Sequence, residues 1–172
     1  MKKLVMAFAI LCSASAFCEG TDYYVALCAW APGQIPSASN PILCGVRGTL
    51  VYGDCLRMDG LDLAIGANRT RERFDGLGVA LVYNYANSLA GVELGFANVV
   101  ERESYGLQLG AWNYAGGVYG AQGGIVNVAD YCAGLQVGLF NWADNLDGLQ
   151  LGLVNVISDQ SLFVFPFLNI GF

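Results

Sequence analysis

A short phrase of about eight residues recurs along most of this chain, and its regular spacing limits the folds that the chain can adopt. The phrase reads glycine, apolar, polar, apolar, small, apolar, any residue, asparagine. Its eight copies begin at Gly45, Gly60, Gly76, Gly91, Gly106, Gly120, Gly134 and Gly148, so that successive copies start 14 to 16 residues apart. A fixed period of this kind indicates one structural unit that is stacked many times.

The three clearest copies define the residues that we expect to be structurally essential. They are the two glycines, the glutamine and the asparagine of each copy: Gly106, Gln108, Gly110, Asn113, Gly134, Gln136, Gly138, Asn141, Gly148, Gln150, Gly152 and Asn155. The third position is polar or glycine in all eight copies, and we expect a hydrogen-bonded ladder there. The copies that begin at Gly60 and Gly76 reach Asn68 and Asn84 one residue late, which predicts bulges or altered turns.

Apolar and polar residues alternate within each copy, as they do in a half-buried β-strand. In the last copy, alternation places Leu151, Leu153 and Asn155 on one face and Gln150 on the other. A helix is disfavoured because each glycine costs ~1 kcal/mol in a helix interior. The sequence therefore predicts an all-β fold in which each period is one strand and one short turn.

Two more strands are expected, at residues 23–30 and 162–172, which brings the total to about ten short strands. The favoured architecture is an antiparallel up-and-down β-barrel of the outer-membrane type, because such barrels use an even number of strands of about ten residues. Hairpin turns are expected at pairs such as Asp144 and Asn145, and the aliphatic face is expected to contact outer-membrane lipid. The terminal Phe172 resembles the assembly signal of such barrels, which implies the barrel-assembly machinery as a partner.

The alternative architecture is a parallel β-solenoid with one coil per 14–16 residues. The motif keeps its direction in every copy, and parallel stacking brings Gln136 onto Gln150, whereas an antiparallel hairpin brings Gln136 to Leu153 or Val154. Against the solenoid, a coil of 14 residues encloses a very small core, and the variable spacing suits adjustable turns.

The composition is apolar and poor in charge. Hydrophobic residues make up 55% of the chain and charged residues 13%, which is about half of the usual ~25%. Much of the chain is therefore buried on both faces, or part of its surface meets something other than water. The only basic cluster, Arg69, Arg71 and Arg73, is interrupted by Glu72, so we expect no binding of nucleic acid, which requires clustered positive charge.

The first residues predict export. Lys2 and Lys3 precede an apolar run and the small residues Ala14 and Ala16, which is the pattern of a signal peptide. We expect a signal peptide at residues 1–16 and a single β-repeat domain at residues 17–172, located in the outer membrane or at the cell surface.

Cysteine and histidine content limit the chemistry. After removal of Cys12, the five cysteines are Cys18, Cys28, Cys44, Cys55 and Cys132. We expect Cys28 and Cys132 to be small apolar core residues, with a bridge among Cys18, Cys44 and Cys55 as the alternative; the pairing stays open. The chain has no histidine, which removes histidine triads and histidine metal sites. We expect no catalytic residue, no metal site and no cofactor.

The repeats resemble a largely uncharacterised group of exported bacterial surface-repeat proteins built from tandem G-L-Q-x-G-L-x-N units. The resemblance is strongest in the copies at Gly106, Gly134 and Gly148 and covers nearly all of the chain after the signal peptide. It implies export and a location in the cell envelope, and it assigns no catalytic residue.

Three functions remain open at this stage. The favoured hypothesis is a non-enzymatic envelope protein, an outer-membrane β-barrel with a structural or surface-exposed role. The first alternative is a small pore or transport protein. The second is an exported β-solenoid that acts as an adhesin or binding module.

Overall fold

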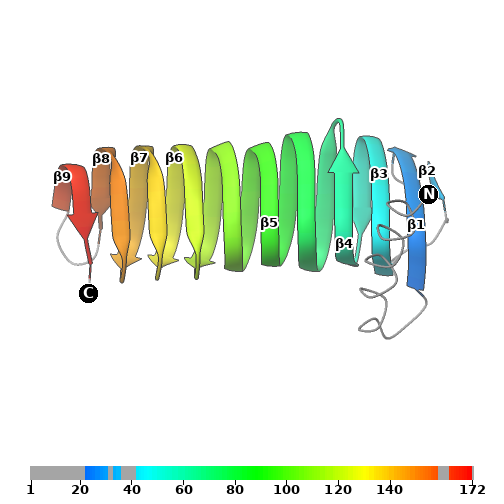
Figure 1. The fold of residues 1–172 in the computed structure, drawn as a ribbon, viewed down its shortest axis with the longest axis horizontal. Coiled ribbons are helices and arrows are strands. Elements are labelled where there is room, and N and C mark those ends of the chain that lie inside the picture. Colours follow the sequence, from blue (N-terminus) through cyan, green and yellow to red (C-terminus); the bar gives the residue numbers. More distant parts are fainter. Residues whose placement is uncertain (1–21, 31–32, 36–41, 159–162, 172) are drawn as a thin grey trace, which may run out of the picture.

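The described residues of the computed structural model, 22–30, 33–35, 42–158 and 163–171, form one parallel β-solenoid of about eight turns. The solenoid is a long rod with β1 and β9 at opposite ends (Figure 1). Its strands are β1 (Asp22–Trp30), β2 (Gly33–Ile35), β3 (Ile42–Cys55), β4 (Arg57–Ala64), β5 (Ala67–Val118), β6 (Ala121–Cys132), β7 (Leu135–Leu146), β8 (Leu149–Ile157) and β9 (Phe163–Ile170). β5 is long because its backbone stays extended around several consecutive coils (Figure 1).

Successive coils pair in parallel and in register, so that equivalent motif residues lie side by side. Gln122 of β6 pairs with Gln136 of β7, and Gln136 pairs in turn with Gln150 of β8. The asparagines follow the same rule, since Asn127 pairs with Asn141. One coil is therefore one repeat.

The all-β prediction is confirmed, but the favoured antiparallel barrel is wrong and the solenoid alternative describes the fold. Asp144 and Asn145, which were expected to form a hairpin turn, lie within β7. The physical reason is the order of the motif. Parallel stacking places each buried polar side chain beside an identical one that can bond to it, whereas a hairpin places Gln136 beside an aliphatic residue and leaves it without a partner.

Each coil turns a corner inside the motif. Gln150 and Asn155 are both fully buried although they are five residues apart, while Leu153 and Val154 between them are 58% and 38% exposed. Two consecutive side chains therefore point outward, and strict alternation slips by one residue. The prediction that Asn155 shares a face with Leu151 and Leu153 is wrong for this reason.

A second corner lies just before the opening glycine of the motif, where the strands are interrupted at residues 119–120, 133–134 and 147–148. The opening glycines stack on one another along the rod. Gly60 has a φ of +132°, and a Cβ built on it lies 2.2 Å from the carbonyl oxygen of Gly45. Only glycine fits this conformation and this close approach.

The core inside the coils is narrow. It consists of two polar columns, of small apolar residues such as Ala115, Ala129 and Ala143, and of larger apolar residues in the N-terminal coils, which are Leu43, Met58, Phe74 and Leu89. The expectation that Cys28 and Cys132 are core residues is confirmed, because both are free and buried; Cys55 is also free and buried. Cys44 is disulfide-bonded.

The two ends of the solenoid differ from its middle. β9 pairs with β8 in the antiparallel sense, and β2 pairs with β1 in the same sense. The main chain of Gly171 exchanges two hydrogen bonds with that of Gly148. Phe172, the predicted signal peptide at residues 1–16 and most of the connection 31–41 lie outside the described residues.

The register can be tested with engineered disulfides in a Cys132→Ala background. Val137 and Leu151 are paired across β7 and β8 and are 43% and 37% exposed, so we expect Val137→Cys with Leu151→Cys to cross-link under mild oxidation. A disulfide needs Cα atoms within ~7 Å. Val137→Cys with Leu153→Cys, a pair that fits the hairpin, is the matched control and should stay reduced; efficient cross-linking of the control alone contradicts the parallel register.

Candidate functional site

The first candidate site is the polar interior, where one asparagine per coil forms a continuous ladder. Asn84, Asn98, Asn113, Asn127, Asn141 and Asn155 are almost completely buried. In each of the first five, Nδ2 donates to the Oδ1 of the asparagine in the next coil over 2.7–2.9 Å, and Asn155 ends the ladder as an acceptor. In the first five, Nδ2 also donates to a main-chain carbonyl of the next coil, as Asn127 does to Val137 over 3.0 Å. Both donor hydrogens are thus used in the ladder.

The glutamines form a second ladder that runs in the opposite direction. The Nε2 atoms of Gln122, Gln136 and Gln150 each donate to the Oε1 of the preceding glutamine over 2.8–2.9 Å. Each Nε2 also donates to the main-chain carbonyl six residues ahead, for example from Gln136 to Trp142 over 3.2 Å. Because asparagines donate toward the C-terminus and glutamines toward the N-terminus, the side-chain amide dipoles of the two columns oppose each other.

The second glycine of the motif makes room for the asparagine ladder. A Cβ built on Gly138 lies 2.5 Å from Nδ2 of Asn127 and 2.8 Å from the carbonyl oxygen of Gly124. A side chain at this position displaces the asparagine amide, which explains why the glycine and the asparagine recur together.

Toward the N-terminus, an ion pair replaces the glutamines. Arg47 and Asp62 are both buried. Nε of Arg47 donates to Oδ1 of Asp62 over 2.9 Å, and Nη2 of Arg47 donates to Oδ2 of Asp62 over 2.5 Å. Burial alone lowers the pKa of Arg47, but the charge and the hydrogen bonds of Asp62 outweigh it and raise that pKa. The guanidinium therefore stays charged inside the solenoid.

The next coil contains Gly78 in place of a polar residue. The ring of Phe74 occupies this space, since a Cβ built on Gly78 would lie 3.2 Å from two of its carbons. Beside it, Asn68 and the Oδ1 of Asn84 have no hydrogen-bond partner among the described residues. The sequence predicted bulges or altered turns in the two copies that contain Asn68 and Asn84. These are the copies in which the asparagine ladder ends.

Glu93 occupies the glutamine column between Gly78 and Gln108. Burial raises the pKa of Glu93 to about 8; a hydrogen bond from Gln108 lowers it and the charge of Asp62 raises it further. The carboxyl group is therefore mainly neutral at neutral pH and stands in for a glutamine. The sequence alone did not predict a neutral carboxyl group.

The second candidate site is the outer surface of the motif, which we call the apolar side. It comprises the second, fourth, sixth and seventh positions of the eight copies, and every one of these residues is aliphatic, aromatic or glycine. The sixth position is the most exposed column: in seven of the eight copies it is a large apolar residue that is 53–68% exposed, and in the copy at Gly106 it is Ala111. The seven are Leu50, Ile65, Leu81, Phe96, Ile125, Leu139 and Leu153. Residues of β1 and β9, among them Leu27 and Leu168, extend the apolar side at both ends.

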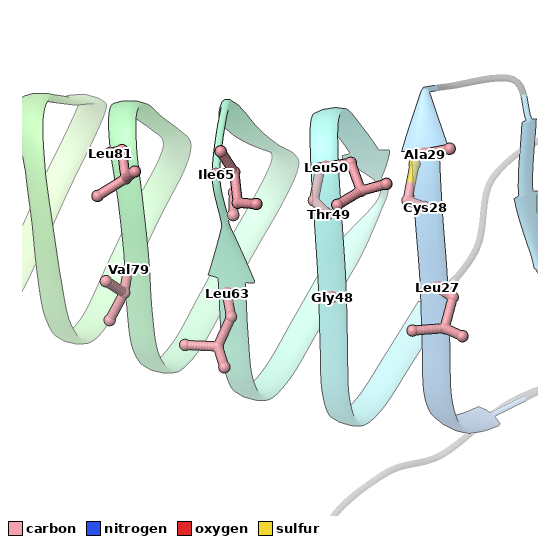
Figure 2. A pocket seen from close by; sticks show the side chains of 11 residues that line it. Leu27, Cys28, Ala29, Gly48, Thr49, Leu50, Leu63, Ile65, Val79 and Leu81 are labelled. Carbon is pink, nitrogen blue, oxygen red and sulfur yellow. The ribbon is translucent and has the colours of Figure 1, made fainter.

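A hollow of about 650 Å³ lies on the apolar side near its N-terminal end. Gly48 has no side chain to fill it, and the surrounding residues include Leu27, Leu50, Leu63, Ile65, Val79 and Leu81 (Figure 2). Its lining comes from β1, β3, β4 and the first part of β5. The walls are almost entirely apolar.

Among the residues that the structure describes, the charged side chains outside the interior lie on the remaining surface, which we call the polar side. Arg71 pairs with Asp54, and Arg73 lies 2.8 Å from Asp75. Three tyrosines form an aromatic row there, in which the Tyr105 and Tyr119 rings stack at 4.9 Å and Tyr119 and Tyr131 follow at 5.9 Å.

The predicted motif residues thus have structural roles in the described coils: the glutamines and asparagines form the two ladders, and the glycines allow close packing. Burial raises the pKa of the Cys132 thiol to about 11, so this thiol is not an activated nucleophile. Among the residues that the structure describes, no group of three or more His, Cys, Asp or Glu side chains is placed to hold a metal ion. Within the same residues, no helix is long and apolar enough to span a membrane.

Sequence reasoning predicted an outward aliphatic face that includes Leu151 and Leu153, but it did not predict that the seventh motif position belongs to the same exposed surface. It assigned the sixth and seventh motif positions to opposite faces, whereas the corner turns both outward. The sequence does contain a sign of this surface, because the sixth and seventh motif positions are both apolar or glycine in all eight copies. No protein-family model, curated protein or solved structure matches the chain.

The asparagine ladder predicts a large cost for removing one of its members. Asn127→Ala leaves the Nδ2 of Asn113 and the Oδ1 of Asn141 without their partners, and each buried unpaired group costs about 1–3 kcal/mol. We expect urea denaturation to show a loss on the order of 2–6 kcal/mol. The exposed Asn145→Ala should change stability by less than about 0.5 kcal/mol; equal effects at both sites would show that the ladder contributes little.

Glu93 predicts a pH dependence of stability. Its pKa in the fold, about 8, lies above the ordinary value of 4.5, so its contribution is fully present below pH 4.5 and is lost as the pH rises through 8. The loss is on the order of 1.4 kcal/mol per pH unit within this window. Glu93→Gln should remove it, so the stability difference between variant and wild type should widen from pH 4.5 to 8 and then level off. A difference that is constant with pH contradicts this assignment.

Proposed function

We propose that this chain is an exported, non-enzymatic β-solenoid of the cell envelope that acts as a binding module. The single observation that supports this proposal most strongly is the division of its surface into one apolar side and one polar side. Monomeric soluble proteins rarely expose contiguous apolar patches larger than a few hundred Å², and this apolar side extends over all eight repeats.

The interior supports a structural role for the polar residues. Asparagine and glutamine amides donate to each other and to main-chain carbonyls, and Arg47 bonds to Asp62. These groups hold the coils in register and are shielded from solvent. The pore hypothesis depended on the barrel, and the described coils enclose packed side chains instead of a lumen.

The partner that we propose is another folded protein with a flat apolar face. A sheet face docks well on a second sheet face, with the two about 10 Å apart. Peripheral binding to anionic lipid uses a basic border around the apolar surface, whereas the outward-facing arginines of this chain, such as Arg71 and Arg73, lie on the polar side. The motif resembles that of exported bacterial surface-repeat proteins. Membership of this group is part of our proposal, and it is consistent with a binding module of the cell envelope.

The test is retention of the chain by the cell envelope. Leu139→Asp with Leu153→Asp places two charges on the apolar side, and we expect the variant to shift from the envelope fraction to the soluble exported fraction. Asn145→Asp with Ser158→Asp adds the same two charges to the polar side of the same coils and should be retained like wild type. Circular dichroism confirms that both variants keep their sheet. If wild type is itself soluble, or if both variants behave alike, the proposal is wrong.

A further inference from the structure

We propose that the partner of the apolar side is a second copy of this chain, packed face to face with the two solenoid axes antiparallel. This inference rests on the proposed function, because it names the partner of the same surface. Three features of the described residues support it: the area of the surface, the placement of charge and the position of the hollow.

The area of the apolar side matches that of a stable dimer. Neighbouring strands are about 4.8 Å apart, so that the eight coils together with β1 and β9 extend over about 48 Å, and the five positions before the corner span about 16.5 Å at about 3.3 Å each. The product, roughly 790 Å², is close to the ~800 Å² that each partner buries in an interface of standard size.

The placement of charge removes the main obstacle to self-association. The chain has a net charge of −6, and two copies would repel each other if their carboxylates met. No charged residue occupies the second, fourth, sixth or seventh position of any copy. Face-to-face packing therefore keeps the carboxylates of both copies, such as Asp130 and Asp144, on the outer sides of the pair.

The hollow sets the relative direction of the two copies. It lies in the coils of β3, β4 and early β5, where Gly48 leaves a gap (Figure 2). The C-terminal coils are fuller, with Leu139, Phe140 and Leu153 on the apolar side. A twofold axis parallel to the strands reverses the order of the coils, so that the second coil faces the seventh. The larger side chains of one copy then enter the hollow of the other, twice per dimer.

This geometry places Ile65, in the second coil, opposite Leu139, in the seventh, because both occupy the sixth motif position. Each is more than half exposed in the single chain, at 59% and 54%. Substitution of either residue by a charged one buries an unpaired charge at both contacts of a homodimer. Opposite charges at the two positions meet only in a mixed dimer.

Sedimentation velocity on the purified chain tests the proposal. We expect wild type to sediment as a dimer, and Ile65→Arg and Leu139→Glu each to lower the dimer fraction at least tenfold, while Asn145→Glu has no effect. A mixture of Ile65→Arg and Leu139→Glu should recover the dimer, and the recovery should weaken in high salt. Monomeric wild type, or a mixture that stays monomeric while each variant keeps its sheet by circular dichroism, overturns the proposal.

Two further outcomes separate this inference from the proposed function. Monomeric wild-type protein that is retained by the envelope leaves the binding module in place and refutes the second copy as partner. Binding of that monomer to vesicles of phosphatidylcholine identifies lipid as the occupant instead and also refutes the dimer. A dimer that is not retained by the envelope supports the pairing and refutes the envelope role.

Discussion

The whole solenoid depends on in-register parallel stacking of identical residues. Every coil places its motif positions directly beside those of the next coil, so one favourable contact is repeated along the rod and so is any unfavourable one. This rule selects side chains that are compatible with their own copies: amides that can both donate and accept, glycines that tolerate close approach, and apolar residues that pack on one another. An acidic side chain fits in such a column when its carboxyl group is protonated, as that of Glu93 is at neutral pH, or when it forms an ion pair, as Asp62 does with Arg47.

The amide columns also explain how a coil of only 14 to 16 residues can have a core. The buried apolar residues of the C-terminal coils are mostly small, as Ala115, Ala129 and Ala143 are, so that the amide columns fill much of the interior there. Hydrogen bonds between side chains therefore supply much of the specificity, because a shift of one residue breaks every rung of both ladders at once. Such networks stabilise only when all members are satisfied, and the ladder ends where Asn68 finds no partner.

Sequence reasoning reached the strands, the repeat and the ladder residues because these follow from local pattern. Alternation identified strands, and the fixed spacing identified the unit. It did not decide between parallel and antiparallel pairing, since both give the same alternation in each strand and only the contacts between copies differ. The argument that a short coil encloses too little core was the misleading step, because it counted apolar residues alone and ignored Gln108, Gln122 and their equivalents as core. The outward aliphatic face was predicted, but the seventh motif position was assigned to the opposite face, because the corner at Leu153 and Val154 turns two successive side chains outward and no strict two-residue period describes this.

The antiparallel strand at the C-terminal end has a consequence for growth of the rod. An open parallel edge at β8 would present the unused acceptor of Gln150 and a free backbone ladder to any similar strand, which is how filaments are templated. In this chain Asn169 donates to that acceptor over 3.1 Å, and β9 reverses the backbone direction. Pro166 within β9 has no amide hydrogen and cannot donate a backbone hydrogen bond to a further strand. The reversed strand thus covers the parallel edge of β8 and ends the glutamine column, which disfavours templated addition of a further parallel coil at β8.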